Sequence, residues 1–256
     1  MPFVKTKASE IHFEWLLRKP ESEEAIFVFL HEALGSIPQW KSFPLELCAQ
    51  SNIPGIIIER SGHGKSSSLK EKRNAQYLHA YANETLEVLS ELIPSNPIHL
   101  VGHSDGGSIA IILGSDQQVK TITTLAAHVL VEPTTIAGVK NSEALFKQLN
   151  IDQKLKKYHG SKTQTLIDAW RETWLSKEFS DWNLFNELRS LSAPILAIQG
   201  EKDEYGTRLQ LETIESLSQN FRITQEIADC GHHPHLSHKE EVISSILSFL
   251  VECNSQ

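Results

Sequence analysis

Along this chain, short runs of apolar residues alternate with longer segments in which apolar residues recur at helical spacing. Most of the runs are apolar almost without interruption, which is typical of strands in a parallel sheet covered on both faces. Apolar residues at helical spacing predict helices over 75–93 and 239–252. The alternation predicts an α/β fold with a mostly parallel sheet and helices on both faces. The predicted strands cover residues 25–31, 54–60, 97–103, 119–127, 193–200 and 221–229.

Two segments depart from this alternation. Residues 10–18 (EIHFEWLLR) alternate apolar and polar side chains, so we expect an antiparallel edge strand there. Residues 134–188 show only helical patterns, and they are far longer than a crossover between strands needs. We therefore predict a core of residues 1–133 and 189–256, with residues 134–188 inserted as a helical cap over one edge of the sheet.

Charge and composition narrow the possible partners. The chain of 256 residues has a net charge of −8, which argues against nucleic acid or an anionic membrane as a partner. The apolar stretches are too short to span a membrane, and the N-terminus has no signal-peptide core. The three cysteines fit neither a disulfide framework nor a zinc site. We expect a cytoplasmic monomer or homodimer that acts on a small molecule.

The sequence GHSDGG, residues 102–107, joins a predicted strand to a predicted helix. A serine hydroxyl is a poor nucleophile unless a base takes its proton and a third group holds that base. Glycines two residues before and after Ser104 allow the close packing that a sharp strand-to-helix turn requires. The context predicts that Ser104 is a nucleophile.

The base and the acid are expected later in the chain. Four histidines follow the last predicted strand, in DCGHHPHLSHKEEV. Their crowding is also typical of a metal site, but no cysteine or carboxylate completes a ligand set, so we expect no metal and no cofactor. Asp203 and Glu204 follow the strand 193–200, and the order Ser, Asp, His fits a hydrolase fold. Glu132 remains an alternative acid.

Five motifs together resemble the α/β-hydrolase superfamily, in the branch with a helical cap. They are FLHEALGS, ERSGHGKSS, GHSDGG, GEKDEYG and CGHHPHLSHKEEV, and the resemblance covers nearly the whole chain. It is closest to bacterial hydrolases whose substrates are poorly defined. The resemblance implies that His232 is the base, that His235 is structural and that His233 is exposed. It also implies a triad of Ser104, His232 and Asp203, and an oxyanion hole formed by the backbone N–H groups of Ala33 and Asp105.

Several residues are candidates for binding substrate. Glu32 stands where the superfamily usually has glycine, so its carboxylate either makes a structural hydrogen bond or reads a polar group of the substrate. Asp105 either favours the start of a helix or reads the ammonium of an amino-acid ester, as an acid does in similar hydrolases. His128 is expected near the mouth of the cap. The remaining candidates are His31, Trp170 and Trp174, while Arg60 and His63 are expected to brace the turn at Ser104.

These features predict a serine hydrolase that cleaves an ester-like bond through an acyl-enzyme. The bond could belong to a carboxylic ester, a thioester, a lactone or an aminoacyl ester. One alternative is hydrolysis of a carbon–carbon bond in a ring-cleavage dione, which similar enzymes perform with the same triad. Another is a non-catalytic receptor of the same fold that closes its cap over a ligand.

Overall fold

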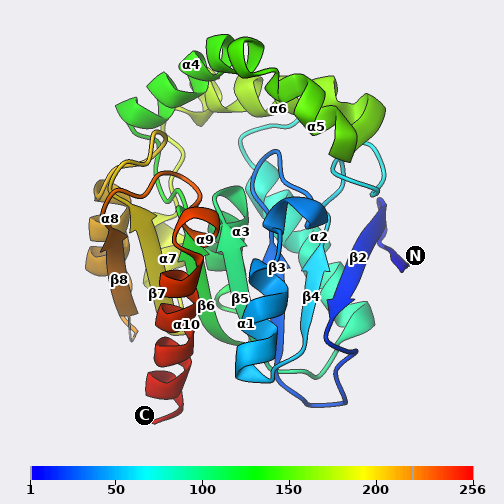
Figure 1. Ribbon diagram of the computed structural model, residues 1–256, viewed down its shortest axis with the longest axis vertical. Coiled ribbons are helices and arrows are strands. Elements are labelled where there is room, and N and C mark those ends of the chain that lie inside the picture. The colour runs from blue at the N-terminus through cyan, green and yellow to red at the C-terminus, as the bar shows by residue number, and fades with distance from the viewer. Residues whose placement is uncertain (1, 221, 256) are drawn as a thin grey trace.

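The computed structural model describes residues 2–220 and 222–255. Its centre is a sheet of eight strands within the described residues, in the order β1-β2-β4-β3-β5-β6-β7-β8 (Figure 1). Neighbouring strands from β4 to β8 in this order are parallel. The strands are β1 Phe3–Lys5, β2 Glu10–Leu16, β3 Ile26–Leu30, β4 Gly55–Ile58, β5 Ile98–His103, β6 Val119–Leu125, β7 Ile195–Gly200 and β8 Arg222–Ile227. The predicted fold class is confirmed.

The N-terminal side of the sheet differs from the prediction in one respect. Strand β2 is antiparallel to β4, as the alternation in residues 10–18 indicates. It is not an edge strand, however, because β1 pairs with it on its other side. Strand β1 has only three residues, FVK, which is too few to show a period in the sequence.

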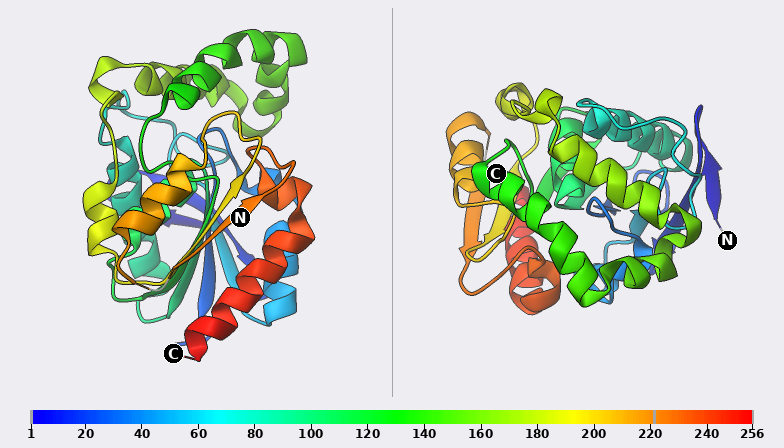
Figure 2. Two further views of the ribbon diagram at one scale, coloured as in Figure 1. Left: turned by 90° about the vertical axis from the view of Figure 1, so that its left-hand side faces the viewer. Right: turned by 90° about the horizontal axis from the view of Figure 1, so that it is seen from above.

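Helices cover both faces of the sheet. Helices α1 and α10 lie on one face, and α2, α3, α7 and α8 lie on the other (Figures 1 and 2). Alternate residues of β3 therefore enter different cores: Phe27 and Phe29 pack towards α1 and α10, and Val28 and Leu30 pack on the opposite side. The helices are α1 Phe43–Ser51, α2 Tyr77–Leu92, α3 Asp105–Leu113, α7 Phe185–Ser190, α8 Leu209–Leu217 and α10 Lys239–Asn254.

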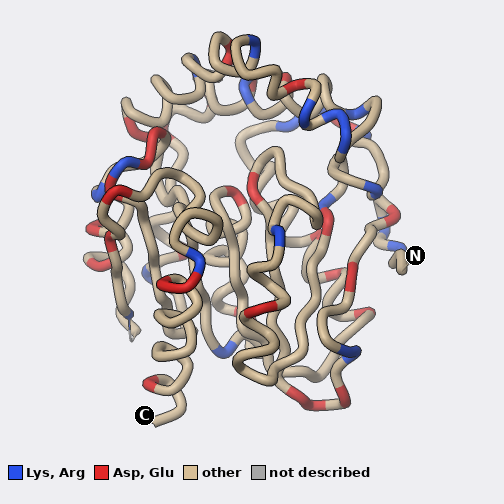
Figure 3. Tube along the Cα trace, in the orientation of Figure 1, with Lys and Arg blue, Asp and Glu red and all other residues tan. Residues whose placement is uncertain are grey.

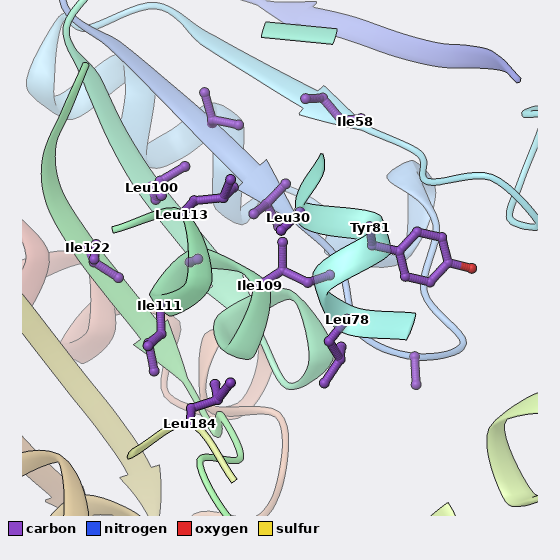
Figure 4. Packing of buried hydrophobic residues seen from close by; sticks show 14 of the residues in the cluster. Leu30, Ile58, Leu78, Tyr81, Leu100, Ile109, Ile111, Leu113, Ile122 and Leu184 are labelled. Carbon is purple, nitrogen blue, oxygen red and sulfur yellow. The ribbon is translucent and has the colours of Figure 1, made fainter. Parts of the chain in front are cut away.

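The larger core lies between the sheet and helices α2 and α3. Figure 4 shows Ile109 of α3 among Leu30 of β3, Leu78 of α2 and other apolar side chains. Ile109, Leu30 and Leu78 are completely buried. Helix α3 is buried along nearly its whole length between the sheet and α2, so the start of this helix has a fixed position.

Between β6 and β7 the chain forms a layer above the carboxyl ends of the strands (Figures 1 and 2). This layer consists of α4 Pro133–Leu149, α5 Ile151–His159 and α6 Thr163–Trp174. Helix α7 leaves the layer and contacts α3 and α8 beside the sheet. The predicted cap boundary at residue 188 falls inside α7. No helix among the described residues is both long and apolar enough to cross a membrane.

The close contact between α3 and β3 generates a prediction about stability. A Cβ atom on Gly106 would lie 1.9 Å from the carbonyl oxygen of Leu30, a contact that requires the backbone to shift. We expect Gly106→Ala to lower the free energy of unfolding by about 3 kcal/mol. This corresponds to a fall in Tm of roughly 6–12 °C for a chain of this size, measurable by differential scanning calorimetry.

Gly231→Ala is the matched control for this variant. A Cβ atom on Gly231 would meet its nearest neighbour, Oε2 of Glu204, at 3.6 Å, which is an ordinary contact. Its Tm should stay close to that of the unchanged protein. Equal Tm values for both variants would mean that the contact at Gly106 does not constrain the fold.

Candidate active site

Ser104 occupies a strained turn between β5 and α3. Its backbone has φ 52° and ψ −119°, in a region that non-glycine residues rarely adopt. The turn is compact because Gly102 and Gly106 allow backbone atoms to approach each other closely. Strain of this kind persists only where the surrounding structure enforces it, and here it lifts the serine side chain above the carboxyl end of the sheet.

His232 and Asp203 reach Ser104 from the loops after β8 and β7. The Oγ atom of Ser104 lies 3.0 Å from Nε2 of His232. The other ring nitrogen, Nδ1, lies 2.9 Å and 2.8 Å from the two carboxylate oxygens of Asp203. The structure therefore brings together the three side chains that the sequence predicts as nucleophile, base and acid, in a continuous chain of hydrogen bonds.

Asp203 is held by groups other than His232. Gln199 donates a hydrogen bond from Nε2 to Oδ2 at 2.6 Å, and the backbone N–H of Tyr205 donates to Oδ1 at 2.8 Å. Burial alone would lower the pKa of His232, but the charge of Asp203 and its hydrogen bond raise that pKa above its ordinary value. Burial raises the pKa of Asp203, but the charge and hydrogen bond of His232, the N–H of Tyr205 and the charge of His128 together bring this pKa below its ordinary value.

In the loop after β3, the carbonyl groups of His31, Glu32 and Ala33 are held by side chains from outside the loop. Arg60 donates from both terminal nitrogens to the carbonyl oxygens of His31 and Glu32. His63 Nε2 lies 3.0 Å from the carbonyl oxygen of Ala33. Arg60 and His63 therefore hold the carbonyl groups of this loop and not, as predicted, the turn at Ser104. The N–H groups of Ala33 and Asp105 make no hydrogen bond within the described part of the chain.

The carbonyl oxygen of Leu34, the next residue of this loop, is held from the cap. Nε2 of His159, at the end of α5, lies 2.9 Å from it, and His159 Nδ1 accepts from the backbone N–H of Gly64 at 3.0 Å. Sequence analysis missed His159, because a lone histidine in a helical pattern carries no signal of a partner 125 residues away.

A cavity of about 290 Å³ opens beside Ser104 under α4 and α6. Its wall includes Ser104, His232, Ala33 and the predicted substrate-binding residues Glu32, Asp105, His128, Trp170 and Trp174. The sequence analysis did not predict that Tyr205 and Gln39 line the cavity, and it considered Glu204, a third lining residue, only as a possible acid. Glu204 and Tyr205 directly follow Asp203 in the sequence, and this position next to the predicted acid could have indicated that they lie at the site. His31 lies outside this wall and lines an adjoining cavity instead.

Glu32 makes the structural hydrogen bond that was one of its two predicted alternatives, and it also lines the cavity. Its Oε2 atom accepts a hydrogen bond from the backbone N–H of Leu34 at 3.0 Å, and its half-buried side chain also lines the cavity. His31 is buried, with Nδ1 2.8 Å from the carbonyl oxygen of Glu32 and Nε2 accepting from the N–H of Arg60 at 3.2 Å. These contacts favour a structural role for His31.

The carboxylate of Asp105 is turned towards the core. Its Oδ2 atom accepts from the Tyr77 hydroxyl at 2.9 Å, and the same hydroxyl accepts from Nε1 of Trp174 at 2.9 Å. Burial raises the pKa of Asp105, and the nearby charges of Arg60 and Arg73 partly oppose this rise. This placement favours the structural alternative for the carboxylate of Asp105, which is the first residue of α3.

The remaining candidates, His233, His235 and Glu132, lie outside the hydrogen-bonded chain of Ser104, His232 and Asp203. His235 is buried against Trp40, with ring centroids 4.8 Å apart, and His233 is exposed at the cavity edge. Glu132 accepts hydrogen bonds from the backbone N–H of Thr207 at 2.9 Å and from its hydroxyl. Asp203 and not Glu132 contacts His232. The described residues contain no cluster of three or more histidine, cysteine or acidic side chains able to hold a metal ion.

The sheet, the cap layer and the turn at Ser104 together define an α/β hydrolase. The sequence matches the Alpha/beta hydrolase family over residues 27–245, which is most of the chain. The chain therefore belongs to this family. A search of curated proteins gives no match to the sequence.

Solved structures share the fold at low sequence identity. A membrane phospholipase A, described as a bacterial virulence factor, has a TM-score of 0.79 and 17% identity, covering 100% of this chain and 86% of that one. The enol-lactonase from Burkholderia xenovorans LB400 has a TM-score of 0.73 and 13% identity, covering 98% and 100%. Proline iminopeptidase from Mycobacterium smegmatis has a TM-score of 0.70 and 17% identity, covering 98% of each chain.

The contact between His232 and Asp203 generates a prediction about proton binding. We expect the pKa of His232, followed by NMR titration of its ring, to lie above about 6.5. In Asp203→Asn the pKa should fall below that of the unchanged protein, because burial then acts without the opposing carboxylate. The control is Asp229→Asn, which removes an exposed carboxylate without a contact to His232. A His232 pKa that is unchanged in Asp203→Asn would contradict this electrostatic coupling.

Proposed function

We propose that this protein is a serine hydrolase that cleaves an ester-like bond of a small molecule. The observation that carries the proposal is the hydrogen-bonded chain from Ser104 Oγ through His232 to the carboxylate of Asp203. This order of groups activates a hydroxyl at neutral pH, because the histidine accepts its proton and the carboxylate stabilises the resulting cation. The bond cleaved is a carboxylic ester, thioester, lactone or aminoacyl ester.

The reaction proceeds in two halves. His232 takes the proton of Ser104 while Oγ attacks the substrate carbonyl, and the N–H groups of Ala33 and Asp105 donate to the oxyanion. His232 then gives its proton to the leaving group, which departs and leaves an acyl-enzyme. A water molecule, deprotonated by His232, attacks the acyl carbon, and the proton returns to Ser104 as the acid is released.

The proposed nucleophile can be tested without knowing the substrate. A fluorophosphonate should add once to the protein, with loss of fluoride, and intact mass should show no adduct on Ser104→Ala. Esterase activity should fall by on the order of 10⁶ in kcat in Ser104→Ala and in His232→Ala, because the triad acts as a unit. Ser115→Ala removes an exposed hydroxyl close to the end of α3 and should retain both labelling and activity.

Two results would contradict this assignment. If the folded protein gave no adduct, Ser104 would not be an activated nucleophile, and the receptor alternative would take the place of the enzyme. If His232→Ala kept its activity and His235→Ala lost it, the base would be His235.

A further inference from the structure

The charged side chains around the cavity at Ser104 are unevenly distributed. Glu32, Asp105 and Glu204 line it, whereas no lysine or arginine of residues 2–220 and 222–255 does so. Figure 3 shows both acidic and basic segments on the loops between the sheet and the cap layer, so the imbalance lies in the residues that line the cavity. Apart from the histidines, the charged side chains that line this cavity are therefore all carboxylates.

Two of the three carboxylates remain available to a ligand. The carboxylate of Asp105 is engaged by the Tyr77 hydroxyl in the core. Glu32 accepts one backbone hydrogen bond, from Leu34, and Glu204 makes no hydrogen bond or ion pair with the described residues. Glu32 and Glu204 line the same cavity as the His232 ring, and their negative charges both act to raise the pKa of His232.

His128 supplies a separate observation in the same wall. Its Nε2 atom lies 3.0 Å from the carbonyl oxygen of Tyr205. Because a carbonyl oxygen only accepts, Nε2 carries the hydrogen and Nδ1 is left as an acceptor. Nδ1 has no partner among the described residues, and the His128 side chain is 3% exposed. The wall thus contains an unused acceptor besides the two carboxylates.

Aromatic rings line the same cavity as these acceptors. Trp170 and Tyr205 line the cavity in edge-to-face contact, with ring centroids 6.1 Å apart, and Phe146 stacks on Trp170. The faces of such rings attract cations. Carboxylates, an imidazole acceptor and aromatic rings are a combination that suits a positively charged hydrogen-bond donor.

We propose that the substrate carries a protonated amine, which Glu32 and Glu204 bind beside the scissile ester-like bond. This inference rests on the proposed function and specifies its substrate class. An ammonium group brings donors that pair with the two carboxylates, whereas a neutral substrate would leave both without a counter-charge and an anionic substrate would be repelled.

Pairs of esters with equal shape and different charge test the proposal at neutral pH. For an amine on the acyl side, p-nitrophenyl 6-aminohexanoate is compared with p-nitrophenyl heptanoate. For an amine on the alcohol side, 2-(dimethylamino)ethyl acetate is compared with 3-methylbutyl acetate. We expect kcat/KM to favour the cationic member of one pair by about tenfold, which corresponds to about 1.4 kcal/mol. The favoured pair shows on which side of the bond the amine lies.

Variants separate a local effect from the general negative field of the protein. Glu32→Gln combined with Glu204→Gln should abolish the preference for the cationic ester. Glu201→Gln combined with Glu240→Gln removes the same two charges from exposed residues that do not line the cavity, and this control should keep the preference in full.

Three outcomes would overturn the inference. Equal or better hydrolysis of the neutral member in both pairs, with intact fluorophosphonate labelling of Ser104, would refute the amine and leave the hydrolase proposal standing. A preference that persists in the double variant would refute the assignment to Glu32 and Glu204. Absence of labelling and of hydrolysis for every ester would refute the proposed function and this inference together.

Discussion

The contact on which the site depends is the one between the start of α3 and the end of β3. Gly106 lies so close to the carbonyl oxygen of Leu30 that no side chain fits between them. This approach turns the chain sharply at Ser104 and sets the N–H of Asp105 beside the loop that follows β3. Backbone packing thus fixes the positions of the proposed nucleophile and of both proposed oxyanion donors, without any contribution from the side chains that line the cavity.

Buried hydrogen-bond donors fix the orientation of the carbonyl groups in the loop after β3. Arg60, His63 and His159 together bind the carbonyl oxygens of four successive residues, 31–34. Dipoles fixed in advance stabilise a developing charge without the cost of reorientation, which is the largest contribution in many enzymes. Because His159 belongs to α5, the cap layer takes part in fixing this loop as well as enclosing the cavity.

The fold and the positions of Ser104 and Asp203 could be predicted because their signals are local. The glycines around Ser104 are visible in the sequence, as are the strand before each residue and the order along the chain. The choice of His232 among four neighbouring histidines came from the resemblance to the α/β-hydrolase superfamily. The contacts of His159 and the direction of the Asp105 side chain could not be predicted. Both depend on partners far away in the chain, such as Tyr77 for Asp105. The sequence alone does not indicate whether such a side chain points towards a cavity or towards the core.

The carboxylate at position 32 has an electrostatic cost that an uncharged residue would avoid. Oxyanion donation from this loop needs only backbone N–H groups, so the Glu32 side chain is not required for it. Its negative charge would oppose an oxyanion at the proposed donors. It also contributes to the raised pKa of His232, which lowers the fraction of His232 in the neutral form that the proposed base requires. A substrate ammonium bound at Glu32 would offset both effects, since it neutralises the carboxylate only while substrate is present. The enzyme would then be most active towards the substrate that carries the missing positive charge.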